Sequence, residues 1–324
     1  MFDKLLFIET NFHLCETNMR ALLGNLSDTD IRLLRVFMAV VEAGGLSAAE
    51  LELNIGRSTI SRHLKDLEVR LGMTLCRRGR GGFSMTQEGL QIYEYAQRLI
   101  SSIEDFRHQV NDMHRTLQGQ LSIAMFDKTV SNPECHVPDA IADFIASAPE
   151  VQIDIHVVPV NQIEKGVLDG HYQVGIIPTH RPSSSLHYIP LFGEQMHLYC
   201  GRGHPLFDRA ERVEAREIRA QRYAGLSFHS PNMETGRLHG LEKSAVANDQ
   251  EGIATLIKSG AFIGYLPDHY AAPFVAAGSM RRLMRREFDY HCEFAALYRK
   301  SPAPTRLVER FLRALEKGHQ PSDN

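Results

Sequence analysis

The sequence predicts a chain of three parts: a winged helix-turn-helix, a long helix with a coiled-coil pattern, and an α/β domain. Three observations support this fold class. Three short helical segments precede a turn rich in glycine and arginine, an unbroken heptad pattern follows, and strand-like and helix-like segments alternate beyond Gly119. The 324 residues suffice for two or three domains, and 43% hydrophobic with 23% charged residues is typical of an ordinary globular protein.

The cysteine and histidine patterns exclude several classes of protein. Five cysteines lie far apart, at positions 15, 76, 135, 200 and 292, which argues against a disulfide framework and for a reducing compartment, so we expect a cytoplasmic protein. No apolar run approaches the ~18 residues of a membrane helix, and the acidic N-terminus is a poor signal peptide. The sixteen histidines show no HxxxH spacing, and CxxC is also absent. We therefore expect no metal and no cofactor.

The first two helices are expected to form the scaffold of the helix-turn-helix. Ser27 is a suitable N-cap, and acidic residues follow it in the first turn. Apolar residues then fall on one face as far as Val41, and Gly44-Gly45 ends the helix. A second helix is expected from about Ser47 to Leu53, and a third from about Arg57 to Leu71.

The third helix has one apolar face and one basic face. Ile60, Leu64, Leu67 and Leu71 are spaced 4, 3 and 4, which makes a packing stripe. Between Gly56 and Phe83 seven basic residues stand against two acids, although the whole chain carries a net charge of only −3. This concentration of positive charge on a helix that follows a two-helix scaffold indicates a major-groove reading helix and double-stranded DNA as the partner. The expected contacts from this helix are Arg57, Ser58, Ser61, Arg62 and Lys65.

The stretch TLCRRGRGGFSM predicts two short strands joined by a glycine-rich loop. Arg77, Arg78 and Arg80 lie on or beside this turn. Arginine on a backbone without side-chain bulk suits contact with phosphates or with the minor groove. We interpret the segment as the wing of a winged helix-turn-helix.

A heptad pattern predicts a long helix that pairs two chains. Thr86 is its expected N-cap. The apolar positions are spaced 4, 3, 4, 3, 4, 3 and 4, and are Ile92, Ala96, Leu99, Ile103, Phe106, Val110, Met113 and Leu117. A single narrow seam favours dimerisation over burial in a core, and a symmetric dimer would present two reading helices to two half-sites.

Beyond Gly119 the pattern is that of an α/β domain. The expected strands are Leu121–Met125, Val151–Val158, Gln173–Ile177 and Met196–Cys200, and helices are expected at 138–147 and 160–170. This alternation predicts a mostly parallel sheet.

The chain resembles the LysR-type transcriptional regulators from about Leu26 to its end. The resemblance is carried by STISRHLKDLEVRLGMTLCRRGRGGFSMTQEG, in which Ser61-Arg62, Leu67-Glu68, Leu71-Gly72, Leu75, Arg77 and Thr86-Glu88-Gly89 match the family. Two later motifs agree with it, His204–Leu206 and Ile263–Pro267.

The resemblance implies a division of the chain and a set of partners. Residues 1–26 lie outside the family pattern, 27–85 would form the winged helix-turn-helix, 86–118 the linker helix, and 119–324 the effector domain. The family implies two Rossmann-like subdomains similar to periplasmic binding proteins, with a small-molecule effector between them. It also implies homodimers or homotetramers on promoter palindromes, and RNA polymerase as a further partner. Whether the first 26 residues are native or Met19 is the true start stays open.

The start of the third helix departs from the family pattern. The family often has Ser-Gln-Pro there, whereas this chain has Gly56-Arg57-Ser58. The forked guanidinium of Arg57 would favour guanine, where a glutamine would favour adenine. The departure changes the expected operator sequence but not the expectation of DNA binding.

The effector site is expected where two segments follow strands. The residues in question are Phe126, Asp127, Lys128 and Thr129, then Pro178 and Thr179, and from the other side Phe228 and His229. Lys128 and the Thr129 hydroxyl suit a small organic acid, whereas Asp127 favours an amine or a hydroxyl donor. A thiol-based redox sensor of the same family is the alternative. An enzyme is not expected, since no GxSxG, Walker, GxGxxG or HExxH motif is present. The sequence leaves open the effector, the operator, the target genes, and whether the outcome is activation or repression.

Overall fold

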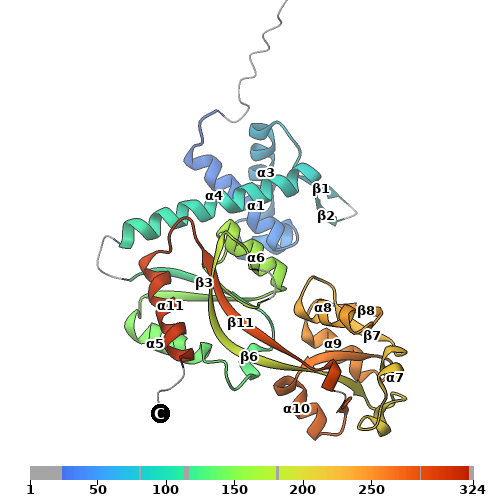
Figure 1. Cartoon of the computed structure of the whole chain (residues 1–324). Coiled ribbons are helices and arrows are strands. Elements are labelled where there is room, and N and C mark those ends of the chain that lie inside the picture. Colours follow the sequence, from blue (N-terminus) through green and yellow to red (C-terminus); the bar gives the residue numbers. More distant parts are fainter. Residues whose placement is uncertain (1–23, 80–81, 113–116, 180–181, 285, 321–324) are drawn as a thin grey trace, which may run out of the picture. The chain divides into compact units, whose positions relative to one another are not determined.

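The computed structural model describes residues 24–79, 82–112, 117–179, 182–284 and 286–320 (Figure 1). The chain forms two compact units, an N-terminal unit that ends at Ile100 and a C-terminal unit that begins at Ser101. The boundary falls within one long helix, and each unit is described by itself.

The N-terminal unit is a winged helix-turn-helix. Its elements are α1 (Asp28–Glu42), α2 (Leu46–Leu53), α3 (Arg57–Leu71), β1 (Cys76–Gly79), β2 (Gly82–Met85) and the first part of α4 (Gln87–Asp112). The predicted bounds of the third helix are confirmed, and the second helix begins one residue before the expected Ser47. Ser27 is the N-cap of α1, and its backbone N–H donates to Asp30 Oδ2 at 2.8 Å. The wing strands pair antiparallel, from Cys76 opposite Met85 to Gly79 opposite Gly82.

The apolar stripe of α3 fills the core of this unit, as predicted. Its four residues Ile60, Leu64, Leu67 and Leu71 are all buried, and they pack in one cluster with the α1 side chains Leu33, Leu34, Phe37 and Val40. Each fully buried aliphatic side chain of this kind contributes about 1.5–3 kcal/mol. The opposite face of α3 is thereby held toward solvent.

Two glycines and a glutamate join α3, the wing and α4. Gly72 ends α3 at φ +67°, a left-handed conformation that residues other than glycine rarely adopt. Glu68 Oε1 accepts the backbone N–H of Leu75 at 2.9 Å, which fixes the start of the wing. Thr86 caps α4 as predicted, because its Oγ1 accepts the N–H of Gly89 at 2.9 Å. A Cβ at Gly89 would lie 1.9 Å from the Leu75 carbonyl oxygen, so only glycine fits there.

The heptad stripe of α4 is divided between two environments. Ala96 is only 2% exposed within the winged-helix core, and Ile92 and Leu99 pack against the same core. Phe106 and Val110 remain 65% and 37% exposed. The first part of the stripe therefore packs inside its own chain, and the pairing of two chains along the stripe stays a prediction. Met113 lies outside the described residues, and Leu117 packs against the core of the C-terminal unit.

The C-terminal unit is an α/β domain built on one sheet. Its strands are β3 (Gly119–Met125), β4 (Val151–Val157), β5 (Val174–Pro178), β6 (Leu186–Gly201), β7 (Tyr223–Leu226), β8 (Lys243–Ala247), β9 (Ile263–Pro267), β10 (Met280–Arg282) and β11 (Tyr290–Arg299). Its helices are α5 (Val137–Ser147), α6 (Val160–Asp169), α7 (Ala215–Arg219), α8 (Pro231–Leu238), α9 (Gln250–Lys258), α10 (Asp268–Ala276) and α11 (Arg306–His319). Short 3-10 turns cover Thr129–Ser131, Phe207–Arg209 and Arg286–Phe288.

The sheet has two parallel halves joined by two crossing strands. Its strand order is β4-β3-β5-β11-β6-β9-β7-β8, with β10 paired to β6. In the first half β3 pairs parallel with β4 and β5, and in the second half β7 pairs parallel with β8 and β9. The long strands β6 and β11 run antiparallel to each other between the halves (Figure 1). The sheet is therefore mixed rather than mostly parallel, because β6 and β11 carry the chain out and back.

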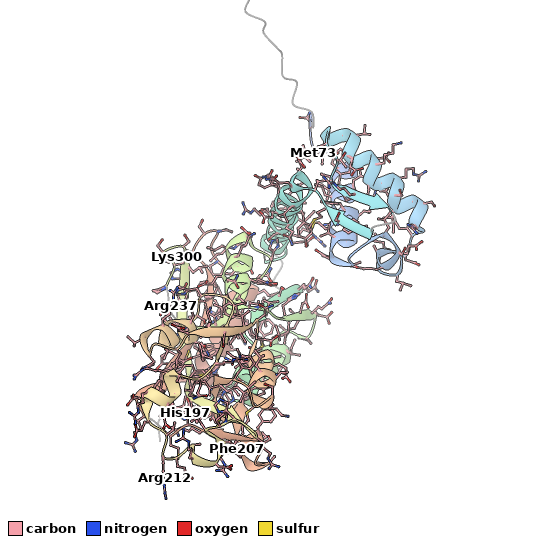
Figure 2. All side chains as sticks on the ribbon, turned by 90° about the vertical axis from the view of Figure 1, so that its right-hand side faces the viewer. Met73, His197, Phe207, Arg212, Arg237 and Lys300 are labelled. Atoms are coloured by element: carbon pink, nitrogen blue, oxygen red, sulfur yellow. The ribbon has the colours of Figure 1, made fainter. Side chains whose placement is uncertain are left out.

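The halves are the two predicted subdomains. Subdomain 1 contains β3, β4 and β5 with α5, α6 and α11, and subdomain 2 contains β7 to β10 with α7 to α10 (Figure 1). In subdomain 1 the amphipathic α11 packs on α5, with the rings of Phe144 and Phe311 5.4 Å apart. The side chains of Phe207 and Arg212 lie toward the opposite end of the unit from Lys300 (Figure 2). No helix in the described part of the chain is long and apolar enough to span a membrane.

Candidate functional site

The polar face of α3 presents its predicted residues to solvent. Arg57, Arg62 and Lys65 are exposed, as is Ser58, while Ser61 is half-buried. The backbone N–H of Arg57 donates to Glu50 Oε1 of α2, and this bond fixes the first turn of α3. Arg77 of β1 is exposed, whereas Arg80 and the side chain of Arg78 lie outside the described residues. The structure thus brings five predicted residues together on one helix beside the wing.

A groove between α1 and α3 widens this basic surface. Its lining includes Arg32 of α1 together with Arg62 and Lys65 of α3. All three side chains are exposed. Arg32 is not among the predicted contacts, because the basic pattern that predicts them lies on α3 and the wing and not on α1.

An ion pair between the exposed Arg70 and the buried Asp30 holds α1 against α3 at the edge of this groove. Asp30 is 1% exposed, and both of its carboxylate oxygens accept hydrogen bonds from Arg70, with Nη2 to Oδ2 at 2.9 Å. The bonds from Arg70, assisted by Ser27, lower the pKa of Asp30 to about 2. Arg70 is thereby a structural residue, although it belongs to the basic cluster of the sequence.

A narrow cavity of about 20 Å³ lies between the two subdomains of the C-terminal unit. It is bordered by the end of β5, the loops after β3 and β7, and the crossing strands β6 and β11, which is where ligands bind in open α/β sheets. We call it the cleft; its lining is Phe126, Pro178, Glu194, Met196, Leu226, Ser230, Pro231, Asn232, Gln250, Tyr290, Cys292 and Phe294.

The predicted effector residues lie in and around this cleft. Phe126 and Pro178 line it, and Phe228 packs edge-to-face on Phe126 with ring centroids 6.0 Å apart. Thr129 is 1% exposed and does not line the cleft. The N–H of Thr179 donates to the Glu293 carbonyl at 2.7 Å, and His229 Nε2 lies 3.2 Å from Glu234 Oε1.

The loop after β3 is joined to subdomain 2 by three side chains, which we call the cross-cleft contacts. Asp127 Oδ2 accepts the backbone N–H of Gln250 at 2.8 Å, at the first residue of α9. Lys128 Nζ lies 2.6 Å from Glu251 Oε2, which also accepts the Tyr270 hydroxyl at 2.7 Å. The charged groups of the loop are therefore engaged by the opposite subdomain.

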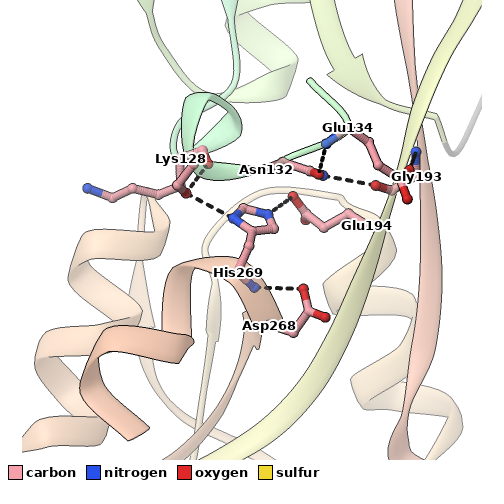
Figure 3. Close-up of polar contacts among 8 residues, drawn as sticks. Lys128, Asn132, Glu134, Gly193, Glu194, Asp268 and His269 are labelled. Carbon is pink, nitrogen blue, oxygen red and sulfur yellow. Dashed lines mark hydrogen bonds and ion pairs between the residues drawn. The ribbon is translucent and has the colours of Figure 1, made fainter. Parts of the chain in front are cut away.

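The third cross-cleft contact runs through His269 (Figure 3). Its Nδ1 lies 2.9 Å from Ser131 Oγ, and its Nε2 lies 3.1 Å from Glu194 Oε2. The side chains of His269 and Glu194 are only 7% and 6% exposed. On the same side of the cleft, Asn132 Nδ2 donates to the Gly193 carbonyl at 2.9 Å. His269 thus connects the β3 loop, the crossing strand β6 and α10.

Burial disfavours negative charge in the cleft. It raises the pKa of Asp127 to about 6 against the opposing hydrogen bond from Gln250. It also raises the pKa of Glu194, against its hydrogen bond from His269. Asp249 and Glu194 add repulsion at Asp127, and Lys128 offsets part of it. The interior is therefore a poor environment for an additional anion.

The cysteines of the described chain are buried thiols. Cys76, Cys135, Cys200 and Cys292 are all buried. Burial raises the pKa of Cys135, and raises that of Cys200 to about 12. Within the part of the chain that the structure describes, no cluster of three or more His, Cys, Asp or Glu side chains could hold a metal ion.

Family models cover both units. Residues 31–90 match the bacterial regulatory helix-turn-helix protein model of the lysR family, and residues 114–320 match the LysR substrate binding domain. The chain belongs to the LysR family. It is a ligand-responsive, DNA-binding transcriptional regulator, which is a non-enzymatic role.

Similar proteins agree with this LysR assignment. The HTH-type transcriptional activator BauR of Pseudomonas aeruginosa is 45% identical over 294 residues, which are 90% of this chain and 96% of the relative. The probable HTH-type transcriptional regulator LrrA of Synechococcus elongatus is 31% identical over 55% of this chain and 59% of its own length. The fold is similar to the crystal structure of CbnR, a LysR family transcriptional regulator, with a TM-score of 0.62 at 19% identity over 90% of this chain and 99% of that one.

Proposed function

We propose that this LysR-family chain binds promoter DNA in the cytoplasm as a homodimer or homotetramer, and that a small molecule in the cleft changes its DNA-bound arrangement. The observation that carries the proposal is that one chain contains both an exposed basic α3 and a cavity whose two sides are joined by contacts between the subdomains. Activation is the proposed outcome, with RNA polymerase as a partner, because the relative from Pseudomonas is named a transcriptional activator.

The DNA-binding part of the proposal assigns two roles. Arg57 and Ser61 contact base edges from the start of α3, while Arg62, Lys65, Arg77 and the wing arginines Arg78 and Arg80 hold phosphates. The exposed Arg32 joins the phosphate set because it lines the same groove as Arg62 and Lys65. A symmetric pair of such surfaces would bind two half-sites of a palindrome.

Selection of double-stranded DNA from a random pool by the full chain tests this part. Wild-type protein is expected to enrich an interrupted palindrome. Arg57→Ala should weaken binding to that DNA by about 1–3 kcal/mol and relax base preference at one position of each half-site. Arg313→Ala, which removes an exposed arginine of α11, is the matched control and should bind like wild type. Unchanged discrimination by Arg57→Ala would remove the base-reading role.

The ligand-binding part of the proposal uses the cross-cleft contacts. A ligand that touches both subdomains favours the arrangement of the subdomains in which its contacts are shortest. It can shift the equilibrium between two arrangements only by the difference between its affinities for them. The expectation of a simple organic acid is weakly supported, since Glu251 engages Lys128 and two carboxylates lie at the cleft. A thermal-shift screen of small metabolites against the full chain tests whether any ligand raises its stability.

The redox alternative has less support from the chain. A sensing cysteine needs an accessible thiolate of low pKa, whereas the four described cysteines are buried and burial raises the pKa of three of them. Operator binding that is equal under reducing and mildly oxidising conditions is the expected result.

A further inference from the structure

One side chain in the cleft is held with its hydrogen-bond donor unused. Asn232, the second residue of α8, is 3% exposed and lines the cavity. The Tyr223 hydroxyl of β7 donates to Asn232 Oδ1 at 2.7 Å. Because the oxygen is engaged, the Nδ2 amide is the group left for the cleft, and it has no hydrogen-bond partner among the described residues.

Two acceptor atoms at or beside the cleft are also unused. Gln250 is 2% exposed and lines the cavity, and its Oε1 has no partner in the described chain. Asp127 Oδ1 is in the same situation, although Oδ2 of that carboxylate accepts the Gln250 N–H. These acceptors come from both subdomains, and Asp127 lies beside Gln250 without itself lining the cavity.

Charge and size restrict the ligand further. Asp127 and Glu194 are acidic, and the nearest cation of the β3 loop, Lys128, is paired with Glu251 outside the cavity lining. A cationic donor would offset this buried negative charge, whereas an anion alone would add to it. Apolar side chains such as Phe126, Leu226 and Phe294 complete the walls of this narrow space, which favours a short ligand.

We propose that the effector is a short primary amine that also carries an oxygen acceptor. The ammonium group donates to Asp127 Oδ1 and Gln250 Oε1, and the acceptor, a carboxylate or a hydroxyl, receives the Nδ2 hydrogens of Asn232. Asn232 and Gln250 are then specificity-determining residues, and Tyr223 is a positioning residue that directs the Asn232 amide. This inference rests on the proposed function, because it names the ligand of the same cleft.

Calorimetry on the full chain with four matched series of probes tests the ligand class. The series are ω-amino acids of two to six carbons, unbranched carboxylic acids and alkylamines of the same lengths, and the corresponding amino alcohols. At least one amino acid or amino alcohol is expected to bind ten times more tightly than the acid and the amine of its length. Comparison of the amino acids with the amino alcohols decides whether the acceptor of the ligand is a carboxylate or a hydroxyl. Equal binding of the acid alone, or binding by no probe, overturns the proposal.

Two variants test the residues. Asn232→Asp replaces the donor with an acceptor at constant shape and should lower affinity for the best probe at least tenfold. Asn161→Asp is its matched control, because Asn161 is also the second residue of a helix but is exposed. Gln250→Met keeps the side-chain length and should reduce the preference for the amino compound over the plain acid. Wild-type affinity in Asn232→Asp, or wild-type preference in Gln250→Met, contradicts the assignment.

Failure of this inference is distinguishable from failure of the proposed function. Wild-type protein that selects a palindrome yet binds plain acids as well as amino compounds keeps the DNA-binding role and loses the ligand class. Wild-type protein that selects no DNA loses the proposed function, whatever it binds in the cleft.

Discussion

Lys128 and Glu251 join the two subdomains directly: Nζ of the first lies 2.6 Å from Oε2 of the second. Lys128 is held at φ +62°, and its ammonium group lies 4.9 Å from the centroid of the Tyr270 ring. The cation that the sequence offers for an anionic ligand is thus a bridge within the protein. A ligand acts on an arrangement that is already held by cross-cleft contacts.

The strength of this bridge can be measured by a double-mutant cycle. Lys128→Met and Glu251→Gln, singly and together, should show a coupling of about 0.5–1 kcal/mol in urea unfolding, because Glu251 is 65% exposed and water screens the pair. The pair Lys128→Met with Glu309→Gln, an exposed glutamate of α11, is the control and should be additive. A coupling near zero in the first pair would show that the bridge does not stabilise the contact between the subdomains.

Acid should weaken the contact between α1 and α3. The pKa of Asp30 falls from 3.8 to about 2 on folding, chiefly through hydrogen bonds from Arg70. Since the folded-state pKa is the lower one, the ionised carboxylate stabilises the fold fully above pH 3.8, and this stability is lost as pH falls through about 2. Asp30→Asn should cost about 2 kcal/mol at neutral pH.

Unfolding measurements across pH check this contribution. The difference in unfolding free energy between wild type and Asp30→Asn should be constant near neutrality and narrow below about pH 4. Asp28 lies in the same helical turn but is exposed. The difference in unfolding free energy between wild type and Asp28→Asn should be smaller and should depend less on pH. A wild-type advantage that persists unchanged at the lowest accessible pH would contradict the ion-pair explanation.

The predicted pairing seam, from Ile92 to Leu117, includes an exposed part of α4. Phe106→Glu places a charge where 65% of the native side chain is exposed, so the subunit should fold normally. If Phe106 faces a partner chain, the buried carboxylate should raise the dimer dissociation constant by at least about tenfold in sedimentation experiments. Leu90→Glu, on the same helix, is the control, since Leu90 is 48% exposed and lies off the heptad positions. Unchanged association of Phe106→Glu would exclude this surface.

Phosphate contact should appear in the salt dependence of DNA binding. Lys65→Ala is expected to weaken binding to specific and random DNA about equally, and to lower the slope of log affinity against log salt by about 1. Lys300→Ala removes an exposed lysine of the C-terminal unit and should leave the slope unchanged. A loss confined to the specific sequence would instead make Lys65 a base-reading residue.

Local signals predicted the N-terminal unit well. The bounds of α3 follow from Gly56 and Gly72, and its buried face follows from the helical spacing of its apolar residues. The sequence pattern predicts only the last part of the crossing strand β6, because Pro190 and Gly193 interrupt the pattern. The structure accommodates Pro190 beside a register shift opposite Phe294 and Ala295.

The sequence predicts an effector site near Phe126 and Pro178, but it does not predict the polar residues Asn232 and Gln250 that line the cleft. Asn232 and Gln250 come from segments far from Phe126 in the sequence, and only the topology of the sheet brings them together. A signal was present in the helix starts, because Ser230 and Asp249 are N-caps that follow strands. Polar residues just after such caps were candidates for the cleft.

Operator binding with and without a cleft ligand tests the central claim most directly. Fluorescence anisotropy of the selected DNA should show at least a fivefold change in affinity of the wild-type chain when the best amino compound saturates the cleft. The same compound, at a concentration that saturates wild type, should have little effect on the operator affinity of Asn232→Asp. Without the compound, this variant should bind the DNA as wild type does. By reciprocity, the DNA should change ligand affinity by the same factor. Superimposable titrations of wild type with and without a ligand that calorimetry shows to be bound would contradict the claim that the cleft controls DNA binding.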